Sequence, residues 1–349
     1  MSTADTRATS GEGGIATPGT QRFAEWVAAH PSAFPLGLLL LTCALVAMIN
    51  PAFLQIGNVY DLLRASVVTG LFALGVMVVL SSGGLDVSFT AIGALVMYVI
   101  TRYVIDHAPD MPMAPILVAG LVGGCLLGVI NGVLVNLLRA PALIITIATQ
   151  YAFRGFLLTF IGTSLVMNIP ASMSAFNDLT LVQGVNADGQ RVRVPAYFLV
   201  FAAAAVVSWL MLNKTLIGRA VYATGARPEI AARLGFNVAR VRVFAFAWAG
   251  ALAGLAGILH VVSNRLANPF DLAGNELTVI AAVVIGGARI TGGTGTVGGT
   301  ISGVLLITLV GSVLIQIGVP SIWRTAVIGA FIIAAGIFYA WVDRAAGRS

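Results

Sequence analysis

Long apolar runs alternate along the chain with short polar connections, and this spacing predicts helices that cross a lipid bilayer. A spanning helix needs roughly 17–25 mostly apolar residues. These runs are too long and too uniformly apolar for the strands of a membrane barrel. Helices satisfy their backbone hydrogen bonds within the lipid, so the pattern predicts an all-α integral membrane protein. We count ten candidate spans, at residues 34–50, 60–81, 86–104, 114–138, 142–162, 195–212, 243–263, 275–289, 296–317 and 322–342.

The eighth run, 275–289, is shorter than the others and predicts a broken or partly inserted helix. It leads into a glycine-rich stretch with Gly286-Gly287 and Gly292-Gly293, which faintly resembles the stretch Gly83-Gly84-Leu85-Asp86 near the start of the chain. Each stretch follows an apolar run and precedes another predicted helix. Because transporters are often built from internal repeats, we hypothesise that the two stretches are remnants of a repeat.

The composition of the 349-residue chain excludes a soluble fold of this size. Its residues are 58% hydrophobic and only 9% charged, with a mean hydropathy of +0.98, whereas soluble domains carry about 25% charged residues. The net charge of +6 is spread among the connections between apolar runs, which is typical of a membrane protein and predicts no nucleic-acid partner. Cys43 and Cys125 lie inside apolar runs, and the cysteines and histidines lack the spacing of a disulfide framework or a metal site.

The distribution of basic residues predicts the orientation. The connection 213–242 contains Lys214 and five arginines, which makes it the most basic in the chain and places it in the cytoplasm. With ten spans, both termini are then cytoplasmic, and the connection 163–194, without a basic excess, is external. The prediction divides the chain into a polar, disordered cytoplasmic tail, one transmembrane domain and a short cytoplasmic tail, at residues 1–33, 34–342 and 343–349.

The basic connection contains a short predicted helix. Pro228 suits the first helical position, Glu229 favours the positive end of the helix dipole, and Gly235 is a natural stop. About two turns are too short to be stable alone in water, so the helix needs a surface to lie against. Ala231 and Ala232 would let another protein approach closely. The residues alone do not choose between that partner and the chain's own helix bundle.

Three stretches together resemble a known transporter family. Residues 80–95, "LSSGGLDVSFTAIGAL", and residues 276–303, "ELTVIAAVVIGGARITGGTGTVGGTISG", look like the two signatures of the ribose/xylose/arabinose-type permeases of ATP-binding-cassette (ABC) importers. Residues 225–259 are similar to the coupling segment of that family and the span after it. The chain departs from the family where Phe89 and Thr90 follow Ser88, and where Pro228 replaces an acidic residue.

The resemblance implies a type II ABC importer-like permease in a bacterial inner (cytoplasmic) membrane. It implies that a periplasmic sugar-binding protein delivers a monosaccharide or sugar-like solute, and that a second permease copy or a paralogue completes the pathway. It also implies that an ABC ATPase subunit contacts the coupling segment. The residues to which this ATPase-coupling role is carried over are Gly225, Pro228, Glu229, Ala231, Ala232 and Gly235.

Nucleotide hydrolysis is expected in a separate chain. Lys214 is the single lysine, and no glycine precedes it at the spacing of a phosphate-binding loop. We therefore expect ATP and Mg²⁺ on the partner ATPase, with no cofactor and no catalytic residue in this chain.

Polar residues within or beside the spans are candidates for a sugar pathway, because polyols need hydrogen-bond partners. Each could equally bond a neighbouring helix. Asp86, beside two glycines, is interpreted as the cap of the third span in preference to a pathway residue, and Arg154 is not assigned to the sugar. The pathway candidates are Asn131, Asn136, Thr146, Thr149, Gln150, Ser263 and Asn264. Candidates for docking the binding protein, on external segments, are Asp178, Asp188, Arg191, Arg193, Arg265 and Asp271.

Two other transport functions stay open. A branched-chain amino acid ABC permease is the nearest alternative, because those permeases look related. An ion-coupled secondary transporter is the second, but that class commonly has acidic residues within its spans, and none is expected in the middle of a span here. An intramembrane enzyme is disfavoured because no nucleophile–base pair or metal spacing is present.

Overall fold

The computed structural model describes residues 32–185, 189, 191–316 and 322–345. Most of the predicted N-terminal tail, Asp188 and the last four residues lie outside this part of the chain. Helices dominate the described residues, with bounds α2 Ala33–Ile49, α3 Ile56–Ser81, α4 Phe89–His107, α5 Met113–Leu138, α6 Ala142–Phe156, α7 Ala171–Asp178, α8 Phe198–Lys214, α9 Leu216–Ala226, α10 Pro228–Arg233, α11 Val238–Asn264, α12 Glu276–Ile285, α13 Val297–Gln316 and α14 Ile322–Ala345.

The all-helical membrane fold is confirmed, but fewer than the ten predicted spans are long enough to cross a bilayer as single helices. Within the described residues, seven helices are long and apolar enough to cross a bilayer, and the pair α8–α9 adds an eighth if its 75° bend belongs to one span. Helix α6 continues into a π-helical turn, Leu157–Ile161, which completes its span. Helices α2 and α12 are shorter. At 1.5 Å per residue, the ten residues of α12 reach about 15 Å, or half of the bilayer core.

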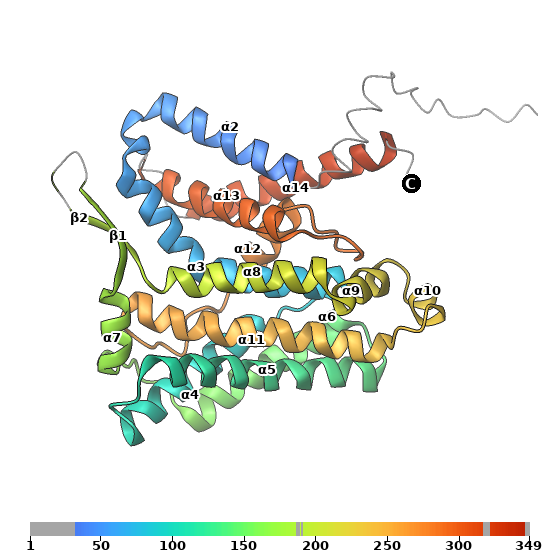
Figure 1. Cartoon of the computed structure of the whole chain (residues 1–349), viewed down its shortest axis with the longest axis horizontal. Helices are drawn as coiled ribbons and strands as arrows, with labels where there is room; N and C mark the ends of the chain where they lie inside the picture. Colours follow the sequence, from blue (N-terminus) through green and yellow to red (C-terminus); the bar gives the residue numbers. More distant parts are fainter. Residues whose placement is uncertain (1–31, 186–188, 190, 317–321, 346–349) are drawn as a thin grey trace, which may run out of the picture.

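One small departure from the all-helical prediction lies in the connection 163–194. Strands β1 (Thr180–Val185) and β2 (Arg191–Pro195) form an antiparallel hairpin there, beside α7. The hairpin and α7 lie at one end of the molecule, and α10 lies at the other (Figure 1). Helix α14 ends on the α10 side (Figure 1), and Phe34 at the start of α2 stacks on Phe338 of α14 with ring centroids 3.8 Å apart.

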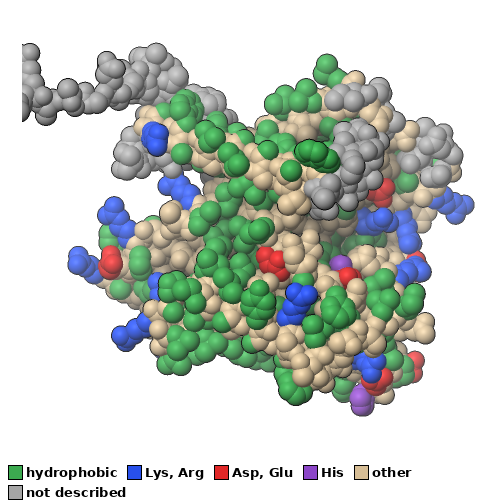
Figure 2. Space-filling view, turned by 180° about the vertical axis from the view of Figure 1, so that it is seen from behind, with side chains coloured by type: hydrophobic (Ala, Val, Ile, Leu, Met, Phe, Trp, Pro, Cys, Tyr) green, Lys and Arg blue, Asp and Glu red, His purple; other side chains and the backbone are tan. Residues whose placement is uncertain are grey.

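Helix α11 is the centre of the bundle and contacts α3, α4 and α5. In an apolar stretch of 18 residues, 83% of the residues of α11 are buried inside the bundle, whereas the share is 22% for α5 and 17% for α14. The outer helices therefore expose apolar side chains, and Figure 2 shows them covering the middle of one face, while most basic side chains gather toward its two ends. This distribution fits a lipid-facing belt between two polar surfaces.

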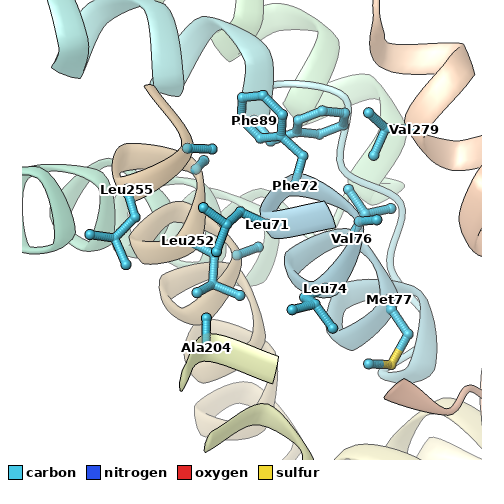
Figure 3. Close-up of a cluster of buried hydrophobic side chains, with 14 of the residues drawn as sticks. Leu71, Phe72, Leu74, Val76, Met77, Phe89, Ala204, Leu252, Leu255 and Val279 are labelled. Carbon is cyan, nitrogen blue, oxygen red and sulfur yellow. The ribbon is translucent and has the colours of Figure 1, made fainter. Parts of the chain in front are cut away.

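The core is formed where α3 and α11 meet α4, α8 and α12. Figure 3 shows this cluster of closely packed aliphatic and aromatic side chains, which are buried from solvent. Its labelled members are Leu71, Phe72, Leu74, Val76, Met77, Phe89, Ala204, Leu252, Leu255 and Val279.

Glycines bring the backbones of α5 and α11 into direct contact. A methyl group on Gly124 would overlap the carbonyl oxygen of Gly250, and one on Gly254 would overlap that of Gly120. Lipid tails are as apolar as the side chains of a helix, so hydrophobic burial does not drive helices together in a membrane. Small residues promote association there because they let the helix backbones approach closely. This backbone contact therefore holds the outer helix α5 on the central helix α11.

We expect Gly124→Ala to destabilise the bundle, because its methyl group meets backbone atoms that cannot rotate away. Overpacking of this kind costs about 1–3 kcal/mol and should lower the melting temperature of the chain in detergent. The matched control is Gly123→Ala on the same helix, whose methyl group would meet only Val96 side-chain atoms at 3.7 Å or more. Equal melting temperatures for the two variants would contradict this account of the α5–α11 contact.

Candidate functional site

Helix α10 is a short exposed helix at one end of the bundle. Pro228 is its first residue, as predicted, and Gly235 has a φ of +87° after its end, where a glycine is favoured. The N–H of Phe236 bonds the carbonyl of Ala231 and so closes the last turn. Glu229 lies in the first turn and is exposed.

The side chains that α10 presents differ in part from the prediction. Ala232 is exposed, but Ala231 is fully buried against the chain itself, so the two alanines do not form one outward face. Ile230 and Leu234 are 44% and 69% exposed instead. This apolar pair was not predicted, although the spacing of four residues between Ile230 and Leu234 places both side chains on one side of the helix.

Gly225, the remaining residue of the predicted coupling set, lies away from the surface. It is buried in α9, where a methyl group would overlap the carbonyl oxygen of Ser81 and lie 2.6 Å from the amide nitrogen of Gly293. Ser81 is the last residue of α3, and Gly293 belongs to the turn between α12 and α13. The structure therefore brings together one residue from each of the three stretches that carried the family resemblance.

This contact, which we call the glycine junction (Ser81, Gly83, Gly225, Gly292 and Gly293), is also held by hydrogen bonds. The Gly293 N–H donates to the Ser81 carbonyl over 3.1 Å. The Tyr222 hydroxyl, one turn before Gly225 on α9, donates to the carbonyl of Gly295 over 2.7 Å. These contacts therefore join α9 directly to the turns after α3 and α12. The two turns meet here, but the repeat that was hypothesised for them stays a hypothesis.

The turn between α3 and α4 runs through the bundle and ends at a buried carboxylate. Asp86 is fully buried, and its Oδ1 accepts hydrogen bonds from the N–H and the hydroxyl of Ser88 at 2.8 and 2.6 Å. Ser88, not Asp86, is the residue that precedes helix α4. Asp86 therefore shapes the turn as an Asx motif, which corrects the interpretation of Asp86 as the helix cap.

Two predicted pathway residues hold this turn in place. Asn131 of α5 donates from Nδ2 to the Ser88 hydroxyl over 2.7 Å. Thr146 of α6 donates to the Leu85 carbonyl over 3.2 Å and accepts from the Val87 N–H over 3.4 Å. Both side chains are fully buried. Their geometry is that of structural hydrogen bonds, which non-helical backbone requires inside a membrane protein.

The other pathway candidates lie in separate places. Thr149 is buried and bonds the Thr146 carbonyl of its own helix, and Asn136 bonds the Ala239 carbonyl across to α11. Ser263 and Asn264 line a cavity of about 370 Å³ between α3, α11 and the start of α12, near the end of α11 that lies toward α7. Gln150 alone reaches a charged group, as its Nε2 donates to Glu276 over 2.8 Å.

Glu276 is a site residue that the sequence analysis missed. It is the first residue of the half-length helix α12 and also accepts a hydrogen bond from Thr90 of α4. Gln150 lies near the middle of the span Ala142–Ile161, so Glu276 lies near mid-depth of the bundle. The described spans carry no acidic residue at their own middle, as expected, but Glu276 at the start of α12 bonds the middle of one of them. An acid beside an unusually short apolar run was the available signal.

The cavity is bordered by a histidine–aspartate pair. His260 of α11 and Asp271 approach to 3.0 Å between Nε2 and Oδ2, and Asn268 donates to the other oxygen of Asp271. Asp271 was predicted to dock a partner, but here it lies against the cavity wall. In the described part of the chain, no group of three His, Cys, Asp or Glu side chains is arranged to hold a metal ion.

Three of the predicted docking residues meet at the end that carries α7. Asp178 pairs with Arg193 of β2 at 3.1 Å and with Arg265 at 2.5 Å, and all three side chains are 41–52% exposed. Arg191 is exposed on the same hairpin. Exposed ion pairs contribute little stability, so this charged cluster is available for a partner. Asp188 lies outside the described residues.

Comparison with known proteins places the chain among permeases. The model of one family, described as the permease component of branched-chain amino acid transport systems, matches residues 58–336. The ribose import permease protein of Bacillus subtilis (strain 168) is 33% identical over 302 residues, which cover 86% of this chain and 89% of that protein.

Relatives with two different printed substrates match over similar lengths. The ribose import permease protein of Haemophilus influenzae is 32% identical over 82% of this chain and 86% of its own length. The autoinducer 2 import system permease protein of Escherichia coli O157:H7 is 30% identical over 86% of this chain and 84% of its own length. No solved structure gives a significant match.

We expect Asn131→Ala to lower the stability of the bundle by about 1–3 kcal/mol, since it removes a buried donor to Ser88. Asn136→Ala is the matched control, because water can replace its half-exposed bond to the Ala239 carbonyl at a cost of about 1 kcal/mol or less. Melting temperatures of both variants in the same detergent provide the measurement. A larger loss for Asn136→Ala would show that the turn at Asp86 does not depend on Asn131.

Proposed function

Because the chain belongs to the family of permease components of branched-chain amino acid transport systems, we propose that it is the membrane-spanning permease of an ABC importer for a monosaccharide or a sugar-like solute. The relatives that cover most of the chain are named for ribose and for autoinducer 2 import, which favours a sugar-like solute over a branched-chain amino acid. The family description itself is too broad to name the solute.

The observation that carries this proposal is the continuous path from an exposed helix to the two glycine turns. Helix α10 offers Glu229, Ile230 and Leu234 to a partner, and α9, which precedes it, is joined to both turns at the glycine junction. In our proposal the partner is an ABC ATPase that binds ATP and Mg²⁺. Its closure moves α10 and α9, and the turns after α3 and α12 follow.

The orientation and the other partners belong to the same proposal. The α10 end, with the basic connection, faces the cytoplasm of a bacterium, and both termini lie on that side. The charged cluster of Asp178, Arg193 and Arg265 at the other end receives a periplasmic binding protein. A second copy of the chain, or a paralogue, completes the pathway, and the chain itself carries out no hydrolysis.

We expect Glu229→Arg to abolish co-purification of the ATPase from membranes of the native host, because it places a positive charge at the positive end of α10 and in the contact. The control is Asp110→Arg, an equal charge reversal in the exposed connection at the opposite end. Pull-down of the tagged chain in mild detergent measures the bound ATPase. A well-folded wild-type chain without any ATPase partner would overturn the importer proposal.

We expect Gly225→Ala to uncouple import from ATP hydrolysis. Its methyl group forces Ser81 and Gly293 apart, at a cost of about 1–3 kcal/mol, whereas the outer face of α10 is left unchanged. The complex should still assemble and hydrolyse ATP, but with less solute taken up per ATP in proteoliposomes. Gly155→Ala is the control, since its methyl group would meet nothing within 4 Å. Normal uptake per ATP in Gly225→Ala would remove the junction from the mechanism.

A further inference from the structure

Glu276 is held by two neutral donors from two different helices. Thr90, in the first turn of α4, and Gln150 of α6 both donate to Oε1 of Glu276. Thr90 is buried, while Gln150 and Glu276 are partly exposed. In the described part of the chain, no hydrogen bond or ion pair reaches the second oxygen, Oε2. One oxygen is therefore fixed and the other is left as an acceptor.

The depth of this carboxylate makes its exposure significant. Gln150 lies near the middle of a 20-residue span, and the half-length helix α12 begins at Glu276 itself. A charged side chain is costly at mid-membrane and usually faces a water-filled cavity or pathway there. The N-terminal end of α12 favours the negative charge, but the resolved contacts include no cation to neutralise it. Keeping this carboxylate at such a depth therefore lowers the stability of the bundle but holds a hydrogen-bond acceptor in place.

The cavity described above leads to the same helix. Its lining includes Asn275, the residue just before Glu276, and Val279 of α12, together with Thr69 and Phe72 of α3, and Glu276 itself lies beside this lining. Its volume of about 370 Å³ falls within the range of small-molecule sites, roughly 300–1,000 Å³. A solute in this cavity therefore lies one residue away from Glu276 along the chain.

The chemistry of the group selects an uncharged polyol. Oε2 of Glu276 accepts from hydroxyl groups, and so does the amide oxygen of Gln150, for which no hydrogen bond from a described residue is found. An anionic ligand would be repelled by the carboxylate. An amino acid could place its ammonium group here, but among the described residues no cationic side chain contacts Glu276, Gln150 or Thr90, and the arginine that lines the adjoining cavity, Arg64, belongs to α3. A metal ion would find a single carboxylate, too few ligands for a dedicated site.

We propose that Glu276, held by Gln150 and Thr90, hydrogen-bonds the hydroxyl groups of an uncharged sugar halfway along the pathway. This inference rests on the proposed sugar import and adds to it a specificity-determining residue. Thr90 and Gln150 act as positioning residues, since they orient the carboxylate by its other oxygen.

The test uses the permease reconstituted in proteoliposomes with its ATPase and its binding protein, and [¹⁴C]D-ribose as the probe. The variants are Glu276→Gln, which removes the charge at nearly constant size, and the double variant Glu276→Gln with Gln150→Glu, which exchanges the acid and the amide. Asp110→Asn neutralises an exposed carboxylate outside the bundle as the control. ATP hydrolysis stimulated by the binding protein is measured alongside ribose uptake.

We expect Glu276→Gln to assemble and to hydrolyse ATP normally, but to take up about tenfold less ribose per ATP or lower still, which corresponds to the loss of one charged hydrogen bond. The double variant should recover part of this loss, and Asp110→Asn should match the wild type. Uptake per ATP in Glu276→Gln within twofold of the wild type would overturn the inference. Loss of assembly or of hydrolysis in both Glu276 variants would also overturn it, because the role would then be structural.

The wild-type arm tests the proposed function separately. Ribose uptake that needs ATP and the binding protein supports the sugar-import premise whatever the variants do. A wild-type complex that assembles and hydrolyses ATP but does not transport ribose would overturn the premise, and the inference about Glu276 would fall with it.

Discussion

Close contact between helix backbones at glycine residues is the interaction on which this structure depends. In lipid, apolar side chains gain little by packing on each other, so helices associate through fine steric fit and hydrogen bonds. Gly124 against Gly250 places α5 on α11, and Gly225 against Ser81 and Gly293 places α9 on two interrupted segments. The first contact builds the bundle, and the second links the α10 end to the interior.

The interrupted segments require polar partners, and these partners bring chemistry into the membrane interior. Non-helical backbone at this depth is tolerated only where its hydrogen bonds are satisfied. Thr146 bonds the backbone of the turn before α4, and Asn131 bonds the Ser88 hydroxyl of that turn, so two of the candidate pathway residues are occupied in holding the fold. Gln150 belongs to the same helix as Thr146 but reaches Glu276 instead. The polar residues that hold the fold thus differ from those that we propose serve the solute in what they bond, and residue type alone does not separate the two groups.

The arrangement separates three tasks along the length of the molecule. Helix α10 is exposed and carries a charged residue with an apolar pair. The glycine junction follows within the bundle, where the backbones of α9 and of the two turns are in direct contact. Glu276 lies deeper, at the start of the helix that ends just before the junction turn. In our proposal, a displacement of α10 passes through this junction to α12, whose first residue binds the sugar.

The sequence by itself determined the class of the protein and its approximate spans. Apolar run length decides whether a helix can cross lipid, and that property is local, so helices α2 to α6, α8 and α11 to α14 fall close to the ten predicted ranges. The family was identified from three short stretches and is confirmed by the match over residues 58–336. The start of α10 at Pro228 and its stop at Gly235 were also local features.

Only the tertiary structure decided which polar residues meet. In the sequence, Glu276 lies at the start of the short apolar run 275–289, and its place beside the middle of a span became visible only when α6 and α4 were packed against it. Ala231 turned inward because α10 lies on its own bundle, which a two-turn pattern cannot specify. Gly225 looked like part of an exposed segment, yet it is buried because residues 81 and 293, both far away in sequence, approach its backbone. Such long-range contacts depend on how helices pack, and that packing has no signature in any one stretch of the chain.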